Sequence, residues 1–332
     1  MAQMKYFYEL TISSSPHAHS PVTTQTIMRD VLIALVPALL GSIYFFGFCA
    51  LLVTLVSAAA CVFFEWGFCK IRKLHCKTYD LSAVVTGVLL AFVCPVTIPY
   101  WTIILGDFFA IVLVKMLFGG LGKNIVNPAL AGRAFLFSWP VLMSNWVKVG
   151  FDNAAGLLST ADAVTAATPM SAMHQGALPE ESILDMFLGN IGGCIGETSA
   201  LLLIIGFIYL LYRKVITARI PLAYIGTVAI LAFLFPQGND RIAWMAAQVF
   251  GGGLMLGAIF MATDYVTSPL TKLGQIVYGI GCGVITILIR YFGGYSEGVT
   301  YAILCMNACA VLLDKIGRPV KFGAPKKEAA KK

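Results

Sequence analysis

The sequence predicts an all-α integral membrane protein with about ten transmembrane helices. Only 12% of its 332 residues are charged and 59% are hydrophobic, whereas a soluble domain has about 25% charged residues. The apolar residues also gather in long runs, and about 20 such residues are enough to cross the hydrocarbon of a bilayer. The chain therefore fits a single large membrane domain.

Ten apolar runs separated by polar breaks define the expected spans. They lie at roughly residues 28–46, 48–69, 81–95, 99–118, 128–146, 191–212, 220–236, 242–262, 273–292 and 298–314. Ten spans divide into two sets of five, and an odd number per half places the halves in opposite orientations. This arrangement is typical of inverted repeats. We therefore expect two inverted five-helix repeats.

The basic residues indicate the orientation. With both termini on one side, 19 of the 23 Lys and Arg residues fall on that side of the membrane. Cytoplasmic loops carry the excess of Lys and Arg, so both termini are expected in the cytoplasm of a bacterial cell with the chain in its inner membrane. The net charge of +7 follows this pattern and does not indicate nucleic-acid binding. The expected surroundings are membrane lipid.

This topology divides the chain into three parts. Residues 1–27 form a cytoplasmic segment, residues 28–314 form the transmembrane domain, and residues 315–332 form a basic cytoplasmic tail. Within the domain, residues 147–190 make the one long connection on the outside. Connections of this length usually have a function.

The nine cysteines include no Cys-x-x-Cys pair, so neither a zinc site nor an iron–sulfur cluster is indicated. Cys305 and Cys309 are one helical turn apart, and we interpret them as two packed thiols; the alternative is a ligand shared with a partner protein. No catalytic residue is predicted in this chain.

A run of small residues in the outside loop, Asp162-Ala163-Val164-Thr165-Ala166-Ala167-Thr168, has two interpretations. In local terms, it is a helix start capped by Asp162 or Thr165. It also resembles the signal at which a flavin transferase joins the phosphate of FMN to a threonine hydroxyl, here Thr168. The typical signal has glycine where this chain has Ala166.

A second candidate site follows the fourth span, where an apolar helix breaks at Gly119-Gly120 and restarts at Pro128. Irregular backbone at membrane depth is tolerated only where it is buried in protein or lines a cavity. Asn124 and Asn127 offer donors and acceptors suited to a planar heterocycle such as a flavin ring. The alternative is a simple turn in which Asn127 caps the next helix.

Four acidic residues lie inside or at the rim of apolar runs, where charge is costly and usually functional. They are Glu65, Asp107, Glu197 and Asp264. The expected topology puts Glu197 near the outer end of its span and Asp264 near the cytoplasmic end of its own. All four are candidates for an ion path, and each could instead be a cap or a structural carboxylate.

Five stretches in this order resemble the NqrB/RnfD family, which comprises the RnfD protein of the Rnf electron-transport complex and the NqrB protein of the sodium-pumping NADH:quinone oxidoreductase. They are residues 15–20, 119–133, 162–168, 192–201 and 262–269. Together they reach from the amino-terminal segment to the eighth span. The short segment before the first span is typical of the Rnf member.

The resemblance implies a function. Members of the family carry covalent FMN on the threonine that matches Thr168, facing outside. The Rnf complex moves electrons between ferredoxin and NAD and couples this to export of sodium or protons. In the quinone-reductase relative, a non-covalent riboflavin lies near the cytoplasmic side, where Asn124 and Asn127 would fall. Its two halves are inverted repeats.

The partners implied are the other membrane and peripheral subunits of an Rnf complex and a flavin transferase for maturation. The chain has no Gly-x-Gly-x-x-Gly and no set of cluster-binding cysteines, so NAD and ferredoxin are expected to meet other subunits. His17 and His19 are interpreted as a membrane or partner contact. Two alternatives stay open: an inverted-repeat permease for a small solute, and a scaffold protein without flavin.

Overall fold

The computed structural model describes residues 22–73, 78–143, 146, 168–179, 181–197, 199–238 and 240–317. Their regular structure is entirely helical, as the composition predicts. The helices are α1 (Thr24–Phe46), α2 (Phe48–Ile71), η1 (Thr78–Asp80), α3 (Ser82–Phe92), α4 (Tyr100–Phe108), η2 (Phe109–Met116), α5 (Pro128–Leu136), α6 (Pro140–Met143), α7 (Pro169–His174), α8 (Ile183–Leu188), α9 (Ala200–Tyr212), α10 (Arg219–Leu234), α11 (Arg241–Phe250), α12 (Leu254–Leu256), η4 (Gly257–Met261), α13 (Lys272–Phe292) and α14 (Val299–Leu313). Two of these segments, η2 and η4, are π-helices.

Within these residues, α1, α2 and α13 are each long and apolar enough to cross a membrane. The α11 helix together with α12 and η4 is a fourth candidate, bent by 58° at its break. The α3, α9, α10 and α14 helices are apolar but shorter. The described part of the chain thus contains three or four complete spans by length and composition, and the ten-span topology stays a prediction.

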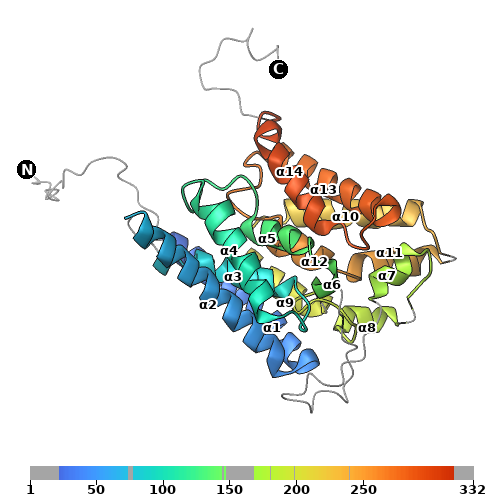
Figure 1. Cartoon of the computed structure of the whole chain (residues 1–332). Helices are drawn as coiled ribbons and strands as arrows, with labels where there is room; N and C mark the ends of the chain where they lie inside the picture. Colours follow the sequence, from blue (N-terminus) through green and yellow to red (C-terminus); the bar gives the residue numbers. More distant parts are fainter. Residues whose placement is uncertain are drawn as a thin grey trace, which may run out of the picture.

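The helices pack as two groups that meet through α5, α9 and α12 (Figure 1). In the amino-terminal group, α2 packs against α1, α3 and α4, and α5 packs against α3, α4 and η2. In the carboxyl-terminal group, α13 packs against α10 and α14, and α10 packs against α11. Contacts of α1 with α9 and of α5 with α14 join the groups.

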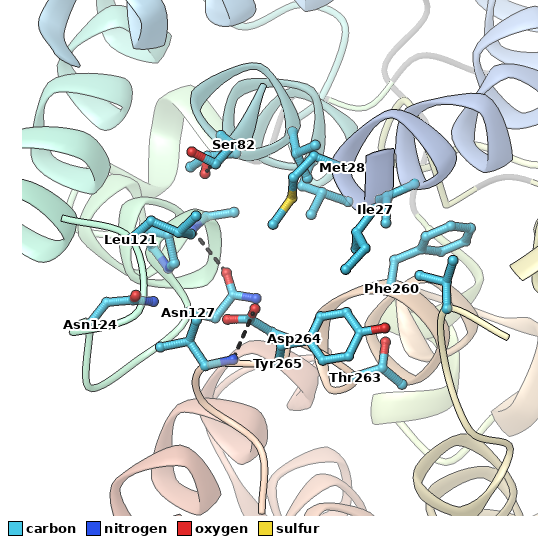
Figure 2. Close-up of a pocket in the computed structure, with 18 of the residues that line it drawn as sticks. Ile27, Met28, Ser82, Leu121, Asn124, Asn127, Phe260, Thr263, Asp264 and Tyr265 are labelled. Atoms are coloured by element: carbon cyan, nitrogen blue, oxygen red, sulfur yellow. Dashed lines mark hydrogen bonds between the residues drawn. The ribbon is translucent and has the colours of Figure 1, made fainter. Parts of the chain in front are cut away.

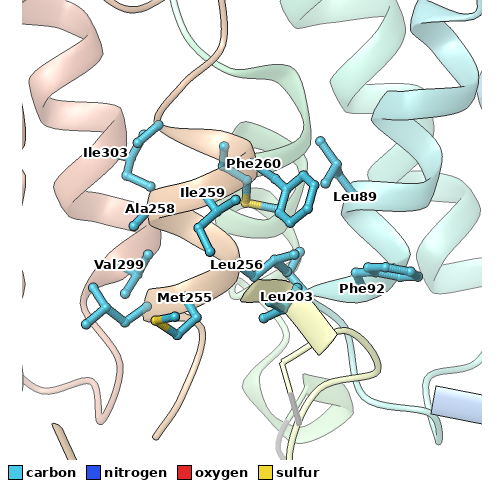
Figure 3. Packing of buried hydrophobic residues seen from close by; sticks show 14 of the residues in the cluster. Leu89, Phe92, Leu203, Met255, Leu256, Ala258, Ile259, Phe260, Val299 and Ile303 are labelled. Carbon is cyan, nitrogen blue, oxygen red and sulfur yellow. The ribbon is translucent and has the colours of Figure 1, made fainter. Parts of the chain in front are cut away.

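The continuous segment formed by α12 and η4, which is the second half of the bent candidate span, lies in the centre of this contact (Figure 3). Its residues Leu256 and Phe260 are buried. They lie between Phe92 of α3 on one side and Val299 and Ile303 of α14 on the other (Figure 3). This central segment therefore packs against helices from both groups.

Four expected spans are not continuous helices. The predicted 128–146 span ends as α5 at Leu136, and residues 137–139 form a turn before Pro140. The 191–212 span becomes helical only at Ala200. The 81–95 span ends at Phe92, and the 242–262 span breaks at residues 251–253. A hydropathy average over a window cannot register such breaks.

The non-helical backbone just before α9, at residues 194–197, is buried and finds partners inside the protein. The amide N–H groups of Ile195 and Gly196 donate to the carbonyl oxygens of Cys94 and Phe92, at 3.1 and 2.8 Å. The stretch before α9 therefore pairs with the end of α3. This is the condition under which irregular backbone is tolerated at membrane depth.

The interpretation of Cys305 and Cys309 as packed thiols was wrong. Both are free and exposed on α14. Among the described residues, no group of three or more His, Cys, Asp or Glu side chains is arranged to hold a metal ion.

Candidate functional site: two polar cavities

The first cavity, which we call the Asn124 cavity, brings together three of the residues singled out from the sequence. Asn124, Asn127 and Asp264 line it, together with Met28, Ser82 and Lys115. Figure 2 shows Asn127 and Asp264 close together on one side, with Ser82 and Met28 across from them. The residues come from α1, α3, η2, the connection between η2 and α5, and the segment that follows η4.

Asn127 has a structural role, as its position before Pro128 suggests. Its side-chain oxygen accepts hydrogen bonds from the N–H groups of Ala129 and Leu130, so it is the N-cap of α5. Its side-chain nitrogen donates to the carbonyl oxygen of Met261 at 3.2 Å. Asn127 therefore starts one helix and ties it to the end of η4.

Asn124 keeps an acceptor free. Its side-chain nitrogen donates to the Val126 carbonyl oxygen at 3.3 Å. The Oδ1 atom of Asn124 is buried and has no hydrogen-bond partner within the described residues. A buried polar atom without a partner costs about 1–3 kcal/mol, so a ligand donor at this position would be favourable.

Asp264 lies at the end of the broken helix and is partly buried. Its carboxylate accepts from the Thr267 hydroxyl at 3.1 Å and from the Val266 N–H at 3.5 Å. Burial raises the pKa of Asp264 above its ordinary value, and these two hydrogen bonds offset part of the rise. A cation entering the cavity would favour the ionised form.

A buried ion pair forms one wall of the Asn124 cavity. The Lys115 Nζ lies 3.1 Å from the Glu65 Oε1 and donates to the Ser82 Oγ at 2.8 Å. Lys115 is only 2% exposed. Glu65, an expected ion-path residue, is therefore held by a cation.

The second cavity, which we call the Thr168 cavity, contains the expected flavin acceptor. Its lining includes Thr168, Arg133, Glu197 and Glu297, with the aromatic rings of Phe137 and Tyr295. The Thr168 hydroxyl oxygen accepts from the Ser171 N–H at 3.3 Å, so Thr168 is the N-cap of α7. Asp162 and Thr165, the other residues of the expected attachment motif, lie outside the described residues, as do His17 and His19.

Arg133 is held in the wall of this cavity by two carboxylates. Its guanidinium lies 3.1 Å from Glu197 and 2.6 Å from Glu297. Glu297 also accepts from the Gly253 N–H. Arg133 is only 2% exposed, and its Nε has no partner within the described residues.

A second buried cation lies beside this group. The Arg290 guanidinium donates to the carbonyl and the side-chain oxygen of Gln248, at 2.6 and 2.9 Å. A methyl group placed on Gly252 would lie 3.3 Å from Glu297 and 3.4 Å from Arg290. Two arginines and two glutamates thus gather around the break between α11 and α12, and their charges balance.

Glu197 and Asp264 lie in different cavities. Asp107 belongs to neither lining: it is fully buried and accepts from Ser57 on α2. The sequence interpretation missed Arg133, Arg290 and Lys115 as buried partners, because it weighed only the acidic residues in apolar runs. The same rule, that charge at membrane depth is usually functional, applies to cations.

These features define a multi-pass membrane protein with two separate cavities that place polar side chains in largely apolar walls. One is built around a break after η2 and the other around a break before α12. Residues 11–323 match the model of the NQR2, RnfD, RnfE family. The chain belongs to this family.

Relatives named for an activity cover nearly the whole chain. The chain is 46% identical to the D subunit of the Na(+)-translocating ferredoxin:NAD(+) oxidoreductase complex of Acetobacterium woodii, over 96% of each protein. It is 44% identical to the D subunit of the proton-translocating ferredoxin:NAD(+) oxidoreductase complex of Clostridium ljungdahlii, over 94% of this chain and 96% of that protein. It is 34% identical to the D subunit of the ion-translocating oxidoreductase complex of Actinobacillus succinogenes, over 93% of this chain and 96% of that protein.

Proposed function

We propose that this chain is the membrane subunit of an ion-translocating ferredoxin:NAD oxidoreductase complex, and that it carries FMN covalently on Thr168. Full-length similarity to two relatives named for that activity supports the assignment. FMN would supply one- and two-electron redox chemistry, while the chain binds and orients it. The partners are the other subunits of the complex and a flavin transferase.

The observation that carries the attachment proposal is the position of Thr168 at a cavity. Thr168 shares this lining with three aromatic residues, Phe137, Trp146 and Tyr295, and with Arg133, whose Nε–H has no partner within the described residues. Aromatic side chains suit a flat heterocycle, and a buried guanidinium N–H suits a carbonyl or phosphate oxygen. These residues fit a phosphorylated flavin held at the cavity mouth.

Peptide mass analysis tests the attachment. In protein made together with a flavin transferase, the peptide that contains Thr168 should carry the mass of FMN less one water. Thr168→Ala should abolish the added mass, and Thr168→Ser is the matched control because it keeps both the hydroxyl and the helix cap. Thr165→Ala should weaken attachment by damaging recognition by the transferase. An unmodified Thr168 peptide would contradict the attachment and would leave the flavin-free scaffold or the permease as the better interpretation.

For the Asn124 cavity we propose a second, non-covalent flavin, riboflavin being the candidate. The unpaired Oδ1 of Asn124 supports this ligand class, since a ring N–H could donate to it. The free space is narrow, about 80 Å³, so a ring would enter only if flexible side chains such as Met28 moved aside.

Extraction of non-covalent flavin tests this second site. Asn124→Ala should lower the flavin content, whereas Ile125→Ala, at an exposed neighbouring side chain, should not. Asn127→Ala should instead destabilise the protein by about 1 kcal/mol through loss of the cap. If Asn124→Ala retains the full flavin content, Asn124 does not bind the flavin.

For ion movement we propose a path that uses Asp264 and Glu65 near the Asn124 cavity, Glu197 at the Thr168 cavity, and Asp107 between helices. Glu65, Asp107 and Glu197 are buried and Asp264 is partly buried. This supports the path, because a carboxylate out of water responds strongly to a charge arriving nearby. Asp264→Asn in the reconstituted complex should lower ion transport relative to electron transfer. Normal values of both would leave Asp264 structural.

The ten spans and the inverted repeats also belong to this proposal. The first expected span packs on the sixth, as α1 with α9, and the fifth packs on the tenth, as α5 with α14. A two-fold relation between the halves would produce both pairs. We further propose an inner bacterial membrane with both termini in the cytoplasm.

A further inference from the structure

A seam of polar side chains runs between α2 and the continuous helix formed by α4 and η2. On α2, Ser57, Cys61 and Glu65 follow each other at intervals of four residues, so they share one face of the helix. Asp107 and Lys115 face them from the other helix. The seam meets the Asn124 cavity at Lys115 and Ser82.

Asp107 is the unexplained member of this seam. Its side chain is 0% exposed, and its Oδ2 has no hydrogen-bond partner within the described residues. Its Oδ1 lies 2.7 Å from the Ser57 Oγ and 3.2 Å from the Cys61 Sγ. The two described cations on facing helices, Lys115 and Arg133, are held by other carboxylates. An ionised Asp107 would be a buried charge without an ion-pair partner, which is strongly unfavourable.

The hydrogen-bond count around Ser57 identifies the form of the acid. The Ser57 Oγ lies 2.8 Å from the Gly87 carbonyl oxygen as well as 2.7 Å from Asp107. A serine hydroxyl has one proton and can donate to only one of these acceptors at a time. If Asp107 is protonated on Oδ1, it donates to the Ser57 Oγ, and Ser57 donates to the Gly87 carbonyl oxygen. Each of these two close oxygen–oxygen contacts then has one proton.

A metal cation fits the same place less well. Hard cations such as Ca²⁺ and Mg²⁺ take about six or more oxygen ligands. This site supplies fewer: the two Asp107 oxygens, the Ser57 hydroxyl and the Gly87 carbonyl oxygen. The remaining neighbour is the Cys61 sulfur, a soft ligand. The titratable groups that interact with this site are Cys61 and Cys94, and Cys61 also interacts with Glu65 and Lys115.

We infer that Asp107 is a neutral carboxylic acid and a proton-binding site inside the membrane domain, and that its proton exchanges with the Asn124 cavity along the seam formed by Cys61, Glu65 and Lys115. The protonation of Asp107 does not depend on the proposed ion path. Only a role of this proton in ion movement rests on that path. It needs no flavin on Thr168, so either proposal can fail alone.

Infrared spectroscopy of the purified chain or the whole complex tests the protonation state. At neutral pH, the spectrum of the parent minus that of Asp107→Asn should contain the C=O stretch of a protonated carboxylic acid. Asparagine has the same shape and donates to Ser57 from its amide, so the variant should fold. Asp240→Asn is the matched control: Asp240 is exposed at the start of α11, so this variant should lose carboxylate bands instead. A loss of carboxylate bands in Asp107→Asn would overturn the inference.

Three further measurements complete the test. Carbon-13 labelling of aspartate should shift the protonated-acid band in Asp264→Asn, where Asp264 cannot contribute to it, which keeps the test valid even if Asp107→Asn folds poorly. Replacing potassium by sodium should leave the band unchanged; its conversion to carboxylate bands would show a cation site instead. Transfer to deuterated water should shift the band with time, and Glu65→Gln should slow this shift. An unchanged rate in Glu65→Gln would overturn the route along the seam.

Discussion

At the scale of single residues, partners distinguish a binding side chain from a structural one. Asn124 and Asn127 look alike in the sequence, and both line one cavity. Asn127 uses its oxygen to cap α5 and its nitrogen to hold Met261, a role that the following proline makes predictable. Asn124 has a buried oxygen without a partner among the described residues. No local pattern could reveal that difference, because it depends on what distant helices bring near each side chain.

Asp264 gives a prediction on pH. Burial raises its pKa in the folded protein above 3.8, so the folded state binds this proton more tightly than the unfolded state. Below the ordinary value both states are protonated, and as pH rises through the raised pKa the folded state loses stability. Asp264→Asn stays neutral, so its melting temperature should exceed that of the parent by an amount that grows as the pH rises above 3.8.

Thermal melting in detergent across this range measures the difference. Asp240→Asn is the control, because Asp240 is exposed and asparagine caps a helix as well as aspartate does. Its melting temperature should stay close to that of the parent. A difference between Asp264→Asn and the parent that shrinks as pH rises would contradict the prediction.

At the scale of elements, the breaks in the helices build both cavities. The glycines at residues 119–122 and 251–253 are visible in the sequence and indicate irregular backbone. Which charges surround a break is not visible, since Arg133, Glu197, Glu297 and Arg290 come from four different segments. The π-helices η2 and η4 were also not predictable, because their apolar composition equals that of an α-helix. Each lies directly before a loop that carries polar residues of the Asn124 cavity: η2 before the loop with Asn124, and η4 before the loop with Asp264.

A substitution of Gly252 tests the importance of the break between α11 and α12. Its φ of +66° is in the left-handed region, where a side chain costs about 1–2 kcal/mol. A Cβ would also lie 3.1 Å from Met170 and 3.3 Å from Glu297. Gly252→Ala should therefore lower the melting temperature and reduce FMN attachment, since Met170 belongs to the helix that Thr168 begins. Gly226→Ala is the matched control: a Cβ there meets nothing within 4 Å, and alanine favours the helix by about 1 kcal/mol.

At the scale of the whole molecule, composition and charge predicted the class, and the structure supports it with α1, α2 and α13 as complete candidate spans. Span boundaries were less predictable, because apolar stretches also form short helices that end inside the protein. The half-length helices α3 and α5 illustrate this: both end against non-helical backbone or a turn. The expected orientation depends on how the basic residues are distributed over all the loops of the chain.

Single cysteines placed on the two sides can test this orientation. Lys214 and Arg241 are exposed at opposite ends of α10, one before Arg219–Leu234 and one after it. If both termini are cytoplasmic, Lys214→Cys should react with a membrane-impermeant maleimide only after the cells are permeabilised. Arg241→Cys should react in intact cells, and Lys326→Cys should behave like Lys214→Cys. The parent, with its nine cysteines, gives the background for each measurement. External labelling of Lys214→Cys or Lys326→Cys would reverse the topology and move the Thr168 cavity to the cytoplasmic side, where a flavin facing outside would be impossible.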